Sequence, residues 1–148
     1  MSNFKVSEFE KNCLSLLGNV LQDFGYSHRK TYVRPSGVAV EFVNGSIYLY
    51  VIVESNTIVL DMIVMVNADE YFRVSLNQIF WSMGFKNLVD NISIQEKLKA
   101  LSVLFREHFS NVLSGNLSNI DKRYCFKMSK SECERYIYMQ TGQRGTPL

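Results

Sequence analysis

The stretch from residue 38 to residue 66 constrains the fold most strongly, because its apolar side chains recur at every second position over three segments. A period of two places alternate side chains on opposite faces of a strand, and the β-branched and aromatic residues that dominate here favour strands. The dipeptides Asn44-Gly45 and Ser55-Asn56 divide the stretch and are typical of hairpin loops. We therefore expect an antiparallel meander of strands near 38–43, 46–54 and 57–66, preceded by a strand near 29–34.

The two expected loops specify which residues pair across the strands. The first loop predicts the pairs Phe42–Ile47, Val40–Leu49 and Val38–Val51. The second loop predicts the pairs Val53–Ile58, Val51–Leu60, Leu49–Met62 and Ile47–Val64. Both hairpins then send their strongly apolar side chains to one face, and a slip of one residue in either hairpin would remove this agreement.

The opposite face of the expected meander is both aromatic and acidic. It carries Glu41 opposite Tyr48, Ala39 opposite Tyr50, and Tyr50 opposite Asp61. A solvated sheet face is usually plainly polar. Tyrosine buries a large area and keeps a hydroxyl for hydrogen bonding, which suits a contact surface and also a second core layer beneath a helix. The sequence leaves both alternatives open.

Helical periodicity flanks the expected sheet on both sides. Apolar residues from Phe9 to Phe24 recur every three or four positions, which predicts an amphipathic N-terminal helix that ends at Gly25. Further helices are expected over 75–84, 93–114 and 129–142, with a helical turn or two near 117–126. The predicted fold class is α+β: an N-terminal helix, an antiparallel β-meander of about four strands, then three or four helices packing on the sheet. We expect one globular domain over 1–142 and a flexible tail over 143–148.

Composition and charge give no support to several function classes. With 16 Lys+Arg against 14 Asp+Glu, the net charge is +2 and the basic residues are scattered, so nothing indicates a nucleic acid partner. No apolar stretch is long enough to span a membrane, and the N-terminus has no signal-peptide pattern. The three cysteines are an odd number without metal-ligand spacing, which is typical of a reducing compartment. We therefore expect a cytoplasmic protein.

Nothing in the sequence indicates catalytic chemistry. The only histidines, His28 and His108, are 80 positions apart, and neither lies beside a Cys, a Ser in a glycine elbow or a clustered pair of acids. No glycine-rich phosphate loop occurs. We expect no catalytic residue, no cofactor and no metal site, and so a protein that is not an enzyme.

The order of the elements resembles a family of small bacterial immunity proteins from polymorphic toxin and contact-dependent growth inhibition systems. The matching segments are Phe24-Gly25-Tyr26, Tyr32-Val33-Arg34, 36–42 (Ser-Gly-Val-Ala-Val-Glu-Phe), 74–80 (Val-Ser-Leu-Asn-Gln-Ile-Phe) and the Leu-rich stretch 98–113. The resemblance covers about positions 9–115. It implies a non-enzymatic protein that binds the C-terminal domain of a cognate toxin and blocks its active site. This chain departs from the usual acidic balance of nuclease inhibitors.

The aromatic and acidic sheet face is the expected contact surface for such a toxin. The predicted partner-binding residues are Tyr32, Arg34, Glu41, Tyr48, Tyr50 and Asp61. A monomer is favoured. Two alternatives remain: a small secretion chaperone that binds an effector segment and usually dimerises, and an enzyme of unrecognised type, which would need a pocket holding a perturbed His or Cys.

Overall fold

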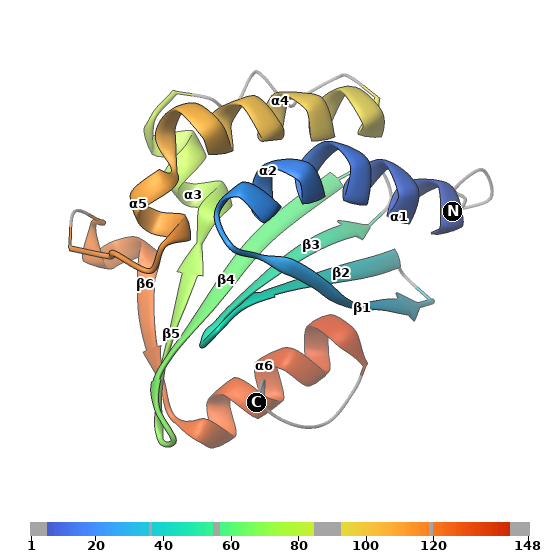
Figure 1. Cartoon of the computed structure of the whole chain (residues 1–148). Coiled ribbons are helices and arrows are strands. Elements are labelled where there is room, and N and C mark those ends of the chain that lie inside the picture. The colour runs from blue at the N-terminus through green and yellow to red at the C-terminus, as the bar shows by residue number, and fades with distance from the viewer. Residues whose placement is uncertain (1–5, 36, 55–56, 85–92, 119, 143–148) are drawn as a thin grey trace.

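The computed structural model describes residues 6–35, 37–54, 57–84, 93–118 and 120–142. In these residues a six-stranded antiparallel sheet, ordered β1-β2-β3-β4-β5-β6, lies between helices on both of its faces (Figure 1). The strands are β1 (Ser27–Arg34), β2 (Gly37–Asn44), β3 (Ile47–Glu54), β4 (Thr57–Asn67), β5 (Glu70–Ser75) and β6 (Cys125–Met128). The α+β class, the N-terminal helix and the antiparallel meander are confirmed, whereas the expected number of strands is too small. No helix in the described ranges is both long and apolar enough to cross a membrane.

The two strands that the sequence did not predict extend the far edge of the meander. β5 follows a tight turn in which the Asp69 amide donates to Asn67 Oδ1 at 2.9 Å. β6 pairs with β5 and spans only four residues, too few to show a period of two. Near 117–126, where a helical turn is expected, the structure has the 3₁₀ turn Lys122–Tyr124, which continues directly into β6.

The second predicted hairpin register is confirmed, and the first is wrong by two residues. Val51 pairs with Leu60 and Leu49 with Met62, as expected, while the loop residues 55–56 lie outside the described residues. In the first hairpin, however, Phe42 pairs with Leu49, because Asn44 remains in β2 and pairs with Ile47. Gly45 has a φ of +59°, a conformation that glycine adopts easily. A shift of two preserves the faces, so the apolar side chains still share one side of the sheet.

The apolar face packs against most of the helices. The N-terminal segment forms α1 (Val6–Cys13), a π-helical stretch (Leu14–Gly18) and α2 (Asn19–Asp23), and the later elements are α3 (Leu76–Ser82), α4 (Ile94–His108) and α5 (Ser110–Leu113). Figure 1 shows these helices on one side of the sheet. Phe80 and Phe109 meet edge to face, with ring centroids 4.6 Å apart, inside the larger of two core clusters.

The last helix, α6 (Lys130–Thr141), lies on the opposite face of the sheet (Figure 1). Its ends are as the sequence predicts: Ser129 and Glu132 form a capping box, and Gly142 closes the helix in the left-handed conformation. α6 places Cys133 and Ile137 against Tyr48, Tyr50 and neighbouring side chains in a second, smaller core cluster. The expected tail, 143–148, lies outside the described residues.

Candidate contact surface

Four of the six predicted contact residues lie beneath α6 instead of on an open face. Glu41 and Asp61 are each 2% exposed, Tyr48 is 4% exposed and Tyr50 is 1% exposed. The expectation that this sheet face is free to meet another molecule is therefore wrong for these side chains. The alternative in which a helix covers the tyrosines describes the structure, because the chain after β6 returns across this face as α6.

The buried face contains a polar row that runs across five strands. Glu41 pairs with Tyr50, Tyr50 pairs with Asp61, and the row continues to Lys30 on β1 and Ser75 on β5. The row is a direct result of the corrected first register, since the predicted pairing would have placed Glu41 opposite Tyr48. Two carboxylates thus flank one buried tyrosine. Buried charges of this kind require specific partners.

Asp61 finds its partners on β5 and α6. The Tyr136 hydroxyl donates a hydrogen bond to Asp61 Oδ2, and Arg73 Nη2 lies 3.5 Å from the same oxygen. The Arg73 guanidinium also lies over the Tyr136 ring, 4.5 Å from its centroid. Burial, reinforced by the Asp61 charge, raises the pKa of Tyr136 above its ordinary value, so this hydroxyl stays a donor. One carboxylate therefore ties α6 to the centre of the sheet.

Glu41 has a similar pair of partners at the edge of the sheet. Arg29 Nε lies 3.5 Å from Glu41 Oε1, and the Tyr32 hydroxyl lies 3.4 Å from that oxygen. The pKa of Tyr32 is raised, first by desolvation and then by the Glu41 charge. Each buried acid thus has an arginine and a tyrosine. Replacing Asp61 by lysine would bury a second cation beside Arg73, so such a variant tests folding and not contact with a partner.

Some polar atoms in this layer have no hydrogen-bond partner among the described residues. They are Tyr50 Oη, Asp61 Oδ1, Arg73 Nε and Arg34 Nε, and all four belong to side chains on the α6 side of the sheet. Burial raises the pKa of the Tyr50 hydroxyl well above its ordinary value, with Glu41 adding to the shift, so it stays protonated. An unpaired buried polar group lowers stability. The α6 layer is therefore less completely satisfied than the larger core.

The other two predicted contact residues, Tyr32 and Arg34, are partly exposed on edge strand β1. Arg34 contacts two elements: it pairs with Glu54 on β3, and its Nη1 donates to the Met139 carbonyl of α6 at 2.8 Å. β1 pairs with β2 alone among the described strands, so its outer edge carries backbone groups that no described strand binds. Of the predicted set, only these two residues are not buried, and the Arg34 side chain itself is only 11% exposed.

β1 is also the most exposed strand of the central meander. Ser27, His28, Arg29 and Lys30 are exposed, and so is Val33, at 67%. The strand carries three basic residues and no acidic one. The sequence did contain this signal, as the run Ser27-His28-Arg29-Lys30, but only the topology shows that the run lies on a free edge.

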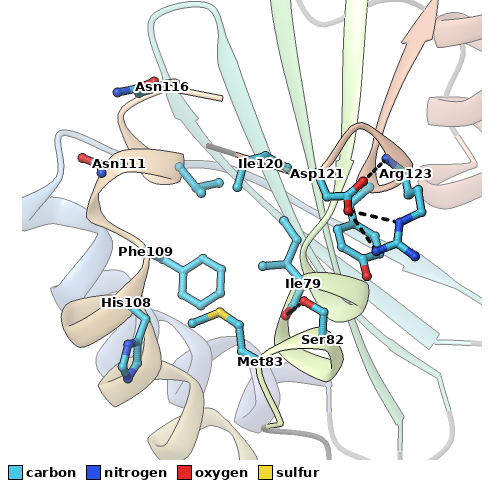
Figure 2. A pocket seen from close by; sticks show the side chains of 12 residues that line it. Ile79, Ser82, Met83, His108, Phe109, Asn111, Asn116, Ile120, Asp121 and Arg123 are labelled. Atoms are coloured by element: carbon cyan, nitrogen blue, oxygen red, sulfur yellow. Dashed lines mark hydrogen bonds and ion pairs between the residues drawn. The ribbon is translucent and has the colours of Figure 1, made fainter. Parts of the chain in front are cut away.

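A pocket lies among the helices on the apolar side of the sheet. The pocket has a volume of about 350 Å³. It is lined by residues of α3, the end of α4 and α5, together with Asn116, Ile120, Asp121, Arg123 and Tyr124 (Figure 2). Ile79, Phe109 and Val112 line it and are buried. Asp121 holds Arg123 through a contact of 2.9 Å, and this hydrogen bond lowers the pKa of the Asp121 carboxyl. The pocket therefore combines a buried apolar part with polar side chains such as Ser82, Asn111 and Asn116, and the one arginine in its lining is already paired.

The two histidines lie apart in the structure as well as in the sequence. His28 contacts Thr31 Oγ1 at 3.0 Å on exposed β1, whereas His108 lines the pocket and lies 3.8 Å from Glu107 Oε2. Within the part of the chain that the structure describes, no three His, Cys, Asp or Glu side chains gather as metal ligands would. That the protein is not an enzyme stays a prediction.

Sequence reasoning missed the partners of the buried acids: Arg29, Arg73 and Tyr136. Tyr136 belongs to a predicted helix, but nothing in the sequence pattern indicates that this helix crosses to the second face of the sheet. Comparison of the chain with protein-family models, with curated proteins and with solved structures gave no significant match. Any function must therefore be inferred from the geometry of the described surface.

Proposed function

We propose that this chain is a non-enzymatic immunity protein, which binds the C-terminal domain of a cognate toxin in the cytoplasm of the producing cell and blocks its active site. The single observation that carries the proposal is the exposed basic edge of the sheet, β1, which includes Tyr32 and Arg34. An edge strand held by a rigid sheet is a preformed binding element, so little ordering is needed on association.

The contact surface we propose is centred on β1 and differs from the face that the sequence indicated. Lys30, Tyr32 and the exposed Val33 would contact the toxin directly. Glu41 and Asp61 act indirectly, because they fix Arg29 and α6 beside this edge. A complex of ordinary size would bury roughly 800 Å² on each partner, which requires neighbouring loops as well as the strand itself.

The test is protection of cells from the toxin. The reading frame immediately upstream would first be examined for a large secreted protein with a C-terminal toxin domain. That domain would then be expressed in a sensitive host, alone and together with this chain, and surviving colonies would be counted. We expect survival only with the chain, and a one-to-one complex by size-exclusion chromatography with light scattering. Equal killing in both strains would contradict the immunity role.

A secretion chaperone is the second candidate, and one observation favours it. The pocket of Figure 2 has an apolar floor beside Met83, which is 43% exposed, and this could hold a side chain of an extended effector segment. Such chaperones usually dimerise. Light scattering on the free chain separates the two candidates, because the immunity proposal expects a monomer and the chaperone proposal a dimer.

A further inference from the structure

The outer edge of β1 presents a defined pattern of side chains. Lys30 pairs with Glu41, Tyr32 with Ala39 and Arg34 with Gly37, so all three side chains lie on the face that α6 covers. Val33 pairs with Val38 and therefore lies on the opposite face. Along the free edge the strand thus reads basic, aromatic, basic at every second position, with an exposed valine between the last two.

We propose that β1 binds an acidic, extended segment of a partner protein as a seventh strand of the sheet. The backbone groups on the outer side of an edge strand can form a ladder with an incoming chain. In such a ladder, directly opposite side chains contact each other, and opposite charges stabilise the pair. Lys30 would face an acidic residue and Tyr32 an apolar one, whereas Arg34 already pairs with Glu54 and donates to the Met139 carbonyl and is assigned no new charged partner.

The pattern specifies the partner residue by residue. An antiparallel partner strand would carry an acidic residue opposite Lys30, an apolar or aromatic one opposite Tyr32 and an apolar one opposite Val33. The antiparallel direction follows the rest of the sheet, in which all described strand pairs are antiparallel.

Charge argues against a second copy of this chain as the occupant. In a symmetric antiparallel pairing of two β1 strands centred on Tyr32, Lys30 would lie opposite the Arg34 of the second copy, and β1 carries no acidic residue that could face Lys30 in any other register. Like charges directly opposite each other destabilise a strand pair. The two arginines of β1 also have acidic partners inside the chain already, Arg29 with Glu41 and Arg34 with Glu54. Lys30 instead lies 5.1 Å from the Tyr32 ring centroid, where an incoming carboxylate can reach it.

This inference deepens the proposed function and rests on it for the identity of the partner, which would be the toxin domain. The probe, however, is independent of any toxin. A fluorescein-labelled peptide with the core Glu-Val-Phe-Thr-Glu would be titrated with the full chain, next to peptides in which both Glu are replaced by Lys or the Val by Pro. We expect the acidic peptide to bind about tenfold more tightly than the basic one, and the Pro peptide to lose binding.

Two matched variants locate the site. Lys30→Glu should weaken binding of the acidic peptide about fivefold. Lys127→Glu makes the same change of charge on β6 at the other edge of the sheet and should leave binding unchanged. Circular dichroism would confirm that both variants fold, and hydrogen exchange should show slower exchange at residues 27–34 in the complex.

The outcomes are distinct from those of the protection assay. No binding of the acidic peptide, equal binding of the acidic and basic peptides, or equal effects of the two variants would overturn the strand-addition proposal even if the chain protects cells. Peptide binding with the expected pattern together with a failure to protect would leave strand addition standing and remove the immunity role.

Discussion

Removal of the Tyr136 hydroxyl should loosen α6 selectively. In Tyr136→Phe, Asp61 Oδ2 loses the hydrogen bond from α6 and keeps only Arg73, at 3.5 Å, while its Oδ1 has no partner among the described residues. A hydrogen bond to a charged group contributes about 1.5–3 kcal/mol. α6 itself buries only Cys133, Ile137 and Thr141, so a loss of about 2 kcal/mol is large for this layer.

The chain contains its own probes for this prediction. Cys133 is buried on the inner side of α6, and Cys13 is buried on α1 in the larger core, so one thiol reports on each helical layer. Burial raises the pKa of the Cys133 thiol to about 11 and that of Cys13 still further, so labelling requires opening of the layer. Cys125 is only partly buried and would be replaced by serine in all variants.

Thiol labelling under native conditions measures the opening of each layer. A loss of about 2 kcal/mol should speed labelling of Cys133 about 30-fold in Tyr136→Phe, with a smaller effect on Cys13. Tyr26→Phe is the matched control, because the Tyr26 hydroxyl donates to the Leu113 carbonyl at 2.6 Å in the other layer. It should speed labelling of Cys13. Equal acceleration of both thiols in Tyr136→Phe, or none, would refute the reasoning.

Three further predictions concern stability, each measured by urea denaturation. Gly18→Ala should raise the free energy of unfolding by about 0.5–1 kcal/mol, because the residue is helical and a Cβ there would lie 3.7 Å from the Phe42 ring; a decrease would contradict this. Gly37→Ala should destabilise the fold by more than about 2 kcal/mol, because the Cβ would lie 1.9 Å from the Val53 carbonyl oxygen; an unchanged midpoint would contradict it. Stability should fall as the pH rises from 9 towards 11, since the Cys133 thiol ionises in the unfolded chain near 9.0 and in the folded chain only near 11; constant stability over this range would contradict it.

The sequence predicts the meander well because its signals are local. The alternation in 38–66 and the loop predicted at 55–56 give the correct register between β3 and β4. The predicted register of the first hairpin is wrong by two residues, because Asn44 stays in the strand although it is typical of a turn. The Asn44 side chain donates to the Phe24 carbonyl at 3.1 Å. That contact joins residues 20 positions apart, and no pattern in the hairpin itself could reveal it.

The site was harder to predict because it depends on which face each helix covers. The tyrosines and acids of the second face are unusual in the sequence, which left an open surface and a covered one as alternatives. Whether this face is open or covered depends on α6, whose Tyr136 forms a hydrogen bond with Asp61, 75 positions earlier in the chain. The exposed edge at β1 depends in turn on the sheet order, in which the first strand is also the outermost one.

The most direct test of the contact surface is hydrogen exchange on the chain, free and bound to the toxin domain that we propose as its partner. Binding at the edge of β1 predicts slower exchange over residues 27–34 and no change over residues 48–52, which lie at the centre of the sheet beneath α6. Unchanged exchange over 27–34, together with altered exchange over 48–52 or in α6, would contradict the account and return the contact surface to the covered face.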